Sequence, residues 1–178
     1  MTRAHIALGA NLGDRLTSMA SALSRIGELD ETVVLAVSRV YESEAWPDAD
    51  ASVFANAVAV VETGLAADAL LEALHEIEEA LGRERGTPNA PRSIDLDIIL
   101  FGSEEWDTPA LQIPHPRFQE REFVTRPLLE VDARATLPDG SPAAPAAVLV
   151  GRIVKELGAL PGFEHMTHGP GSRAQYTD

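Results

Sequence analysis

The fold of this chain is limited most by the order of its strand-like and helix-like segments, which differ in the spacing of their apolar residues. Strands show alternating or β-branched apolar residues, whereas amphipathic helices show apolar residues at every third or fourth position. The strand-like segments are residues 5–8, 32–41, 53–61 and 93–101, and the helix-like segments are residues 16–26 and 70–81. This β-α-β-β-α-β order predicts an α+β fold: a ferredoxin-like split βαβ sandwich, with helices packed on an antiparallel sheet.

The pattern is weaker after the last of these strands. We expect a short helix that begins near Arg117 and ends before Pro127, because a proline interrupts the hydrogen bonding of a helix. Residues 148–157 predict a last helix. Residues 1–160 would then form a single domain, and residues 161–178 a loose C-terminal tail.

Composition limits the partners of the chain. A formal net charge of −14 disfavours contact with a nucleic-acid backbone, so no nucleic-acid partner is expected. No apolar run is long enough to cross a bilayer and no signal-peptide pattern is present, so we expect a cytoplasmic protein without membrane contact, and a monomer. The sequence has no cysteine, which leaves carboxylate and imidazole ligands for a metal and favours a hard cation such as Mg²⁺.

A pair of aspartates inside the strand-like segment 93–101 is the sharpest local signal. Side chains alternate between the faces of a strand, so the alternate apolar residues from Ile94 to Leu100 are expected to fill the core. Asp95 and Asp97 would share the other face, where two Mg²⁺ ions could relieve their repulsion and bridge triphosphate oxygens. The same spacing is also typical of the solvated face of a half-buried strand.

Arginine is concentrated around these aspartates. Of the 14 Lys and Arg residues, six are arginines between positions 83 and 126. They are Arg83, Arg85, Arg92, Arg117, Arg121 and Arg126. A guanidinium group binds phosphate bidentately, so an arginine-rich loop before an acidic strand has the parts that phosphoryl transfer requires. Surface ion pairs are the alternative explanation for any single arginine.

Seven short motifs, taken in their order along the chain, resemble those of a known enzyme family. The motifs are Ile6–Asp14 (IALGANLGD), Ser38–Glu44 (SRVYESE), Phe54–Val58 (FANAV), Gly82–Arg85 (GRER), Pro91–Ile98 (PRSIDLDI), Ile113–Arg117 (IPHPR) and Glu120–Val124 (EREFV). Together they resemble the 6-hydroxymethyl-7,8-dihydropterin pyrophosphokinase family over roughly residues 3 to 140. The resemblance implies transfer of pyrophosphate from ATP to the pterin, with AMP as the other product, in folate biosynthesis.

The resemblance also implies roles for individual residues. The implied catalytic set is Arg83 and Arg92, which stabilise the migrating pyrophosphoryl group, with Asp95 and Asp97, which hold two Mg²⁺ ions on ATP. The implied ATP-binding set is His75, Glu78, Arg85, Ile98, Leu111, His115 and Arg121. The implied pterin-binding set is Ser43, Glu44, Ala45, Trp46, Phe54, Asn56 and Phe123. In this last set the two phenylalanines sandwich the ring, and the Asn56 amide meets its polar edge.

One segment departs from the family pattern. Some members carry a tryptophan in the loop before the Asp-x-Asp strand that helps the loop close over ATP, whereas residues 86–90 here read GTPNA. Two other functions fit the composition. A two-metal phosphohydrolase would use Asp95 and Asp97 and release phosphate without pterin. A non-catalytic ligand-binding module on the same scaffold would need no metal.

Overall fold

A computed structural model of the chain describes residues 1–45, 52–82 and 93–167. Its strands are β1 (Thr2–Ala10), β2 (Thr32–Val37), β3 (Val40–Ser43), β4 (Phe54–Thr63), β5 (Asp95–Phe101), β6 (Trp106–Asp107), β7 (Gln112–Ile113) and β8 (Ile153–Gly158). Its helices are α1 (Arg15–Gly27), α2 (Ala67–Ala80) and α3 (Glu122–Val131), with short 3-10 helices η1 (Phe118–Glu120) and η2 (Glu164–Met166).

The main sheet is six-stranded and antiparallel, with the order β5-β1-β4-β3-β8, and β2 also pairs with β4. Because β2 and β3 lie one after the other along the same side of β4, they act together as one interrupted strand. The order is then that of a split βαβ sandwich, as the sequence predicts. The strands β6 and β7 form a separate small hairpin beside β5.

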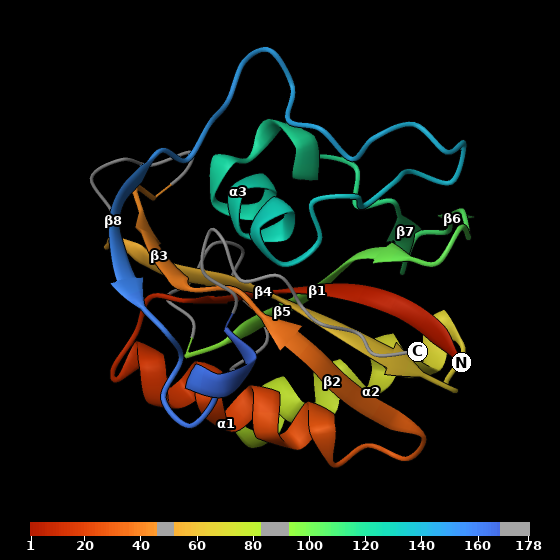
Figure 1. Cartoon of the computed structure of the whole chain (residues 1–178). Coiled ribbons are helices and arrows are strands. Elements are labelled where there is room, and N and C mark those ends of the chain that lie inside the picture. Colours follow the sequence, from red (N-terminus) through yellow and green to blue (C-terminus); the bar gives the residue numbers. More distant parts are fainter. Residues whose placement is uncertain (46–51, 83–92, 168–178) are drawn as a thin grey trace.

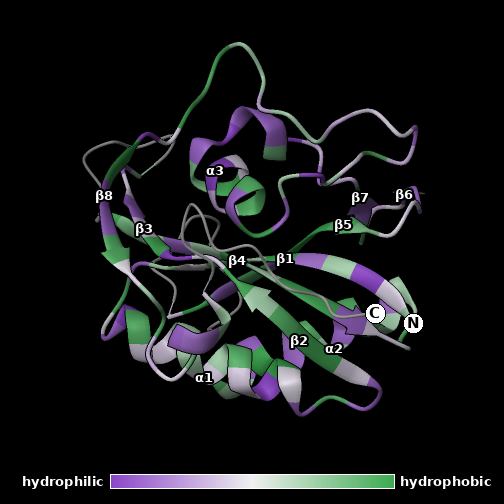
Figure 2. Ribbon diagram, in the orientation of Figure 1, coloured by the Kyte–Doolittle hydropathy of each residue, from purple (hydrophilic) through white to green (hydrophobic). Residues whose placement is uncertain are grey.

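Helices cover both faces of this sheet (Figure 1). The helices α1 and α2 lie on one face and bury residues such as Leu23 and Leu74 against Ile6 of the central strand, in the larger hydrophobic cluster. The helix α3 lies on the other face, where Leu128 packs with Val58 in a smaller cluster. The green inner surfaces of the helices in Figure 2 follow these two clusters. Each fully buried leucine contributes about 2 kcal/mol to this packing.

Two irregularities in the sheet were not predicted. The expected strand 32–41 is broken at Ser38, whose hydroxyl accepts a hydrogen bond from the backbone N–H of Val58 at 3.0 Å. In β5 the pairing with β1 skips Ile99, which is a β-bulge. Leu100 therefore belongs to the cluster beneath α3 and not, as predicted, to the cluster that contains Ile94. An extra residue in a strand reverses the faces of all residues that follow it.

The C-terminal predictions also need correction. The expected last helix is wrong, because residues 153–158 form β8 on the edge of β3. The expected short helix does not end before Pro127, since α3 begins at Glu122 and continues to Val131 with this proline inside it. In the predicted loose tail, Phe163 packs on the larger cluster and Thr167 forms a bridge to Val37. Residues 168–178 lie outside the described residues, so the tail as a whole stays a prediction.

Candidate active site

Four strands place Tyr41, Asn56, Gly9 and Asp95 in a single row across the sheet. Tyr41 pairs with Asn56, Asn56 with Gly9, and Gly9 with Asp95. Paired residues project from the same face of a sheet, and Val58, two residues after Asn56, packs in the cluster beneath α3. The row therefore faces α3. With neighbouring strands about 4.8 Å apart, the backbones of Asn56 and Asp95 are separated by roughly 10 Å.

Gly9 is the member of this row without a side chain. A Cβ atom at this position would lie 3.7 Å from Oδ1 of Asn56 and 4.0 Å from Cβ of Asp95. The glycine thus keeps the surface between the amide and the carboxylate low, and a ligand can span both groups.

The two aspartates of β5 lie on the same face, as predicted, and both are half-buried. Between them, the backbone N–H of Leu96 donates a hydrogen bond of 2.7 Å to Oε1 of Glu78. Glu78 is only 1% exposed, and it reaches β5 from α2, on the opposite face of the sheet. Glu78 thus contacts the strand that carries both aspartates, and its contact with nucleotide, implied by the resemblance, stays a prediction.

The segment before α3 brings a histidine and an arginine to the same region. A cis peptide bond joins Ile113 to Pro114, and the backbone N–H of His115 then donates to the carbonyl of Ile99 in β5 at 3.0 Å. Arg121 is the N-cap residue of α3, and its Nη1 lies 3.5 Å from Nε2 of His115. Because Nδ1 of His115 already accepts from the backbone N–H of Arg117 at 3.3 Å, a neutral imidazole cannot also accept well from Arg121.

The charges of Asp95 and Asp97 affect the pKa values of His115 and Arg121. Burial and the positive charge of Arg121 lower the pKa of His115 to about 4, while the charge of Asp95 opposes the shift. Burial also lowers the pKa of Arg121, opposed first by the charge of Asp97. Within the described residues, Nε of Arg121 is buried and has no hydrogen-bond partner. The site thus holds a desolvated cation and a neutral histidine facing a pair of carboxylates.

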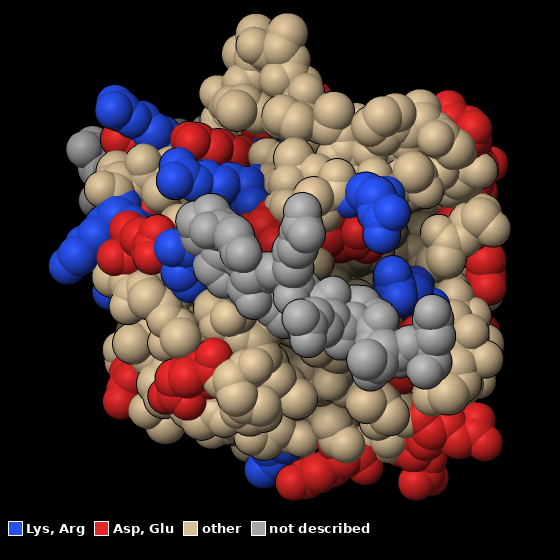
Figure 3. Space-filling model, in the orientation of Figure 1, with Lys and Arg blue, Asp and Glu red and all other residues tan. Residues whose placement is uncertain are grey.

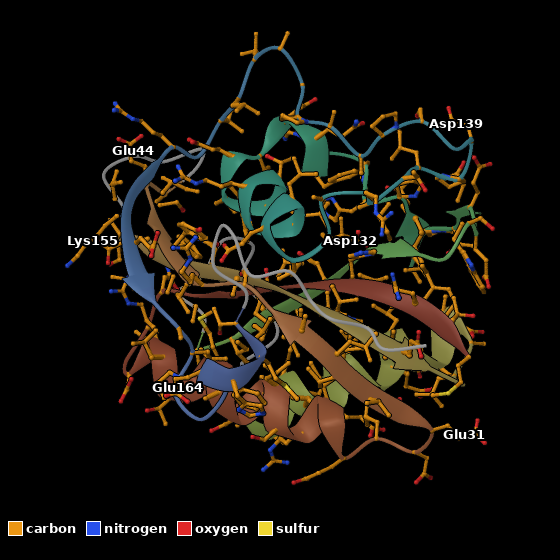
Figure 4. All side chains as sticks on the ribbon, viewed as in Figure 1. Glu31, Glu44, Asp132, Asp139, Lys155 and Glu164 are labelled. Atoms are coloured by element: carbon orange, nitrogen blue, oxygen red, sulfur yellow. The ribbon has the colours of Figure 1, made fainter. Side chains whose placement is uncertain are left out.

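The residues implied to bind a pterin gather at the other end of the row. The side-chain amide of Asn56, 5% exposed, donates to Oγ of Ser43 at 3.0 Å, and Phe54 pairs with Ser43 at the edge of the same face. Glu44 and Ala45 follow directly, and Glu44 lies at the upper left beside the start of β8 in Figure 4.

On the other side of this region, Phe123 stands in the first turn of α3. The guanidinium carbon of Arg121 lies 5.9 Å from the centre of its ring. Gly151 contacts the same ring, since a Cβ built on this glycine would overlap sterically with ring carbons Cδ1 and Cε1. Gly151 is not among the residues that the sequence predicts for this site. Its signal is weak, because a lone glycine between Val150 and Arg152 has no motif around it.

The reaction that this site performs follows from the similarity of the chain to known proteins. The sequence model of the 7,8-dihydro-6-hydroxymethylpterin-pyrophosphokinase family matches residues 5–133. The chain belongs to this family. As a pterin pyrophosphokinase it transfers the pyrophosphoryl group of ATP to a hydroxymethyl dihydropterin in folate biosynthesis, which confirms the enzyme class and the reaction expected from the sequence.

Individual relatives agree with this assignment. The chain is 39% identical over 170 residues to the 2-amino-4-hydroxy-6-hydroxymethyldihydropteridine pyrophosphokinase of Pseudomonas aeruginosa, and the match covers 96% of this chain and 98% of the relative. It is 41% identical over 128 residues to the Bacillus subtilis enzyme of the same name, covering 72% and 77%. A crystal structure of a Plasmodium falciparum HPPK-DHPS triple mutant with SDX-DHP is similar in fold, with a TM-score of 0.54 at 16% identity, over 72% of this chain and 40% of that chain.

Three residues expected to bind ATP lie in the hydrophobic core or on α2, away from the row. Ile98 and Leu111, expected against adenine, are 3% and 7% exposed and belong to the larger hydrophobic cluster. His75 lies half-buried on α2, one turn before Glu78. The predictions for these residues stay predictions. The expected site residues that lie outside the described parts of the chain are Trp46, Arg83, Arg85 and Arg92.

The aspartates of the pyrophosphokinase fit a magnesium ion whose other ligands come from the substrate and from water. Asp95 and Asp97 offer hard carboxylate oxygens on one face. Among residues 1–45, 52–82 and 93–167, no group of three His, Asp or Glu side chains forms a metal cage. Mg²⁺ is ordinarily held by one or two carboxylates together with phosphate oxygens and water, so two aspartates suffice. The family uses Mg²⁺ with ATP.

Charged side chains are unevenly distributed over the surface of the pyrophosphokinase. Figure 3 shows basic side chains on both sides of the band between α3 and the sheet, with acidic side chains beside them, and further acidic surface at the lower and right margins. A cluster of arginines can keep this band attractive to a polyphosphate despite the net charge of −14. Of the helices in the described ranges, none has the length and apolar character needed to span a membrane.

Proposed function

We propose that the row from Asn56 to Asp95 is the line along which the two substrates meet, with the pterin at the Asn56 end and the ATP phosphates at the Asp95 end. The register of β4, β1 and β5 carries this proposal, because it sets the backbones of Asn56 and Asp95 about 10 Å apart, with both side chains on one face and only Gly9 between them. A hydroxymethyl group on a flat heterocycle fits this span, and its oxygen would point toward the aspartates.

At the pterin end, Asn56 is oriented by its own hydrogen bond. Its Nδ2 donates to Ser43, which directs Oδ1 toward Gly9 and the open row. Oδ1 would then accept from the N–H groups on the polar edge of the pterin. Phe54 and Phe123 would stack on the ring, and backbone groups of residues 43–46 would complete the pocket.

At the phosphate end, Arg121 and His115 would share one anionic oxygen. A neutral His115 whose Nδ1 accepts from Arg117 carries its proton on Nε2, toward Arg121. Two donors then face each other, and an oxygen of the pyrophosphoryl group between them would accept from both. The buried Nε of Arg121 offers a further donor. Arg83, Arg85 and Arg92 would add further phosphate contacts, as the family resemblance implies.

The proposed reaction needs positioned charge more than a general base. The hydroxymethyl oxygen forms a bond to the β-phosphorus of ATP, the bond from that phosphorus to the oxygen bridging to the α-phosphate breaks, AMP leaves, and the hydroxyl proton passes to solvent. Asp95 and Asp97 would hold two Mg²⁺ ions, which supply charge neutralisation for the triphosphate when bound. The protein contributes alignment by Asn56 and charge stabilisation by Arg121. We expect the enzyme to work as a monomer, since every proposed contact lies within one chain.

AMP release from ATP and Mg²⁺, measured with and without 6-hydroxymethyl-7,8-dihydropterin, tests the proposal. The unmodified chain should form AMP only when the pterin is present. Asp97→Asn, which keeps the size of the side chain, should lower kcat by about 100-fold or more, the scale of one electrostatic group at a transition state. The matched control is Asp107→Asn on the exposed strand β6, which should leave kcat unchanged. Phosphate released without pterin would instead favour a two-metal phosphohydrolase, and binding without turnover would favour a ligand-binding module.

A further inference from the structure

The segment from Ala146 to Ile153 lies beyond the residues that the family model matches and is joined to the start of α3 by backbone hydrogen bonds. The N–H of Val150 donates to the carbonyl of Glu120 at 2.8 Å, and the N–H of Glu122 donates to the carbonyl of Val150 at 3.1 Å. The N–H of Ile153 donates to the carboxylate of Glu122 at 3.1 Å. This segment, which we call the C-terminal staple, therefore holds the first turn of α3 in place.

The staple also holds the opposite wall of the proposed pterin pocket. The carbonyl of Arg152 accepts from the N–H of Glu44 at 3.0 Å, and Ile153 pairs with Ser43 where β8 joins the edge of β3. Figure 1 shows the chain arching over α3 and then entering β8 alongside β3. Within a few residues, the staple thus touches the elements that carry Phe123 and those that carry Ser43.

Gly151 is the point of closest approach. Its φ of +63° lies in the left-handed region that glycine adopts without cost. The ring of Phe123 lies so close that a Cβ atom at residue 151 would overlap two of its carbons. Because a larger residue cannot be accommodated without moving the ring, the backbone of Gly151 sets where the ring stands.

From these contacts we infer that Gly151 is a positioning residue for pterin binding and that the C-terminal staple is the part of the fold that fixes the distance between the two walls of the pterin pocket. The inference rests on the proposed role of Phe123. It assigns a specific task to a segment outside the family match: the staple acts on the pterin through Phe123, and its bridge from Val150 to Arg121 gives it a second, backbone contact toward the phosphate end.

Gly151→Ala tests this inference, with Gly158→Ala as its matched control. Both glycines have positive φ, +63° and +93°, so alanine strains the backbone at each site. A Cβ at Gly158 meets no atom within 4 Å, whereas a Cβ at Gly151 displaces the ring of Phe123. We expect KM for the pterin to rise about ten-fold in Gly151→Ala, the scale of losing one aromatic stacking partner, with a smaller change in KM for Mg·ATP. Gly158→Ala should change neither constant, although urea unfolding should show that both variants lose stability.

A double-mutant cycle with Phe123→Ala separates the possible failures. If Gly151 acts through the ring, adding Gly151→Ala to Phe123→Ala should cause no further rise in KM for the pterin. Equal pterin constants for Gly151→Ala and Gly158→Ala, beside a raised constant for Phe123→Ala, would overturn the inference and leave the proposed function standing. An unchanged constant for Phe123→Ala itself would remove Phe123 from the proposed pterin site, and the inference about Gly151 with it.

Discussion

Removal of the Glu78 carboxylate is expected to loosen the strand that carries both aspartates. Its Oε1 accepts the N–H of Leu96 at 2.7 Å, and both residues are buried, at 1% and 2% exposure. β5 is the last strand in the order of the sheet, so this N–H has no strand beside it in the described part of the chain. Loss of a charged acceptor for a buried donor costs about 1.5–3 kcal/mol. Glu78→Ala should therefore lower the free energy of unfolding by about 2–3 kcal/mol.

The chemistry of the acceptor can be tested separately from its size. Glu78→Gln keeps an oxygen acceptor without the charge, and charge-assisted bonds are roughly twice as strong as neutral ones, so a loss of about 1 kcal/mol is expected. Urea unfolding in EDTA, followed by circular dichroism, measures both losses without ligand. Glu76→Ala on the exposed side of α2 is the control and should change stability by less than about 0.5 kcal/mol. A Glu78→Ala variant as stable as this control would refute the role assigned to the hydrogen bond.

Two further predictions concern α3 and its flank. The pKa of His115 is lowered to about 4 from an ordinary value of 6.5, so the unfolded chain binds a proton at this residue more readily than the folded one. The contribution of His115 to the free energy of unfolding is therefore fully present above pH 6.5 and is lost as the pH falls toward 4. Between pH 7.5 and pH 5 the free energy of unfolding should fall by about 2 kcal/mol. His115→Gln should remove that part of the pH dependence of urea unfolding. Glu130, whose side chain is 8% exposed, accepts from Nε of Arg39 at 2.9 Å and from the hydroxyl of Tyr41 at 2.7 Å. Glu130→Ala should lower the free energy of unfolding by about 3 kcal/mol, and Tyr41→Phe by only about 1 kcal/mol, in thermal or urea denaturation.

The parts of the fold that the sequence predicts are those with local causes. The expected helix at residues 16–26 is such a case, because α1 spans Arg15–Gly27 and Asp14 caps it by accepting from the backbone N–H of Thr17 at 3.1 Å. The expected helix at residues 70–81 is another, since α2 ends at Ala80 and Gly82 adopts a φ of +90° after its C-cap residue Leu81. The alternation that puts Asp95 and Asp97 on one face is local as well, and the structure agrees with it.

The errors arise where a distant segment decides the structure. Residues 148–157 carry apolar residues near helical spacing, yet residues from Ile153 onward form a strand because the edge of β3 offers unpaired backbone groups. The bulge at Ile99 follows from pairing with β1 and has no glycine or proline to mark it. The row from Asn56 to Asp95 is set by register between strands far apart in sequence, so motifs supply its members but not their adjacency.

The two ends of the row are supported by separate parts of the fold, and this separation has a kinetic consequence. Glu78 reaches the aspartates from α2, through the edge of β5, whereas the C-terminal staple reaches Phe123 from the opposite face. The two supports lie on opposite faces of the sheet, and the effects of mutations at distant sites are ordinarily additive. A change at Glu78 should therefore raise KM for Mg·ATP, a change at Gly151 should raise KM for the pterin, and the combined variant should show the product of both effects. A combined effect well above that product would mean that the row responds as one rigid unit, with the pterin and phosphate ends coupled through Gly9.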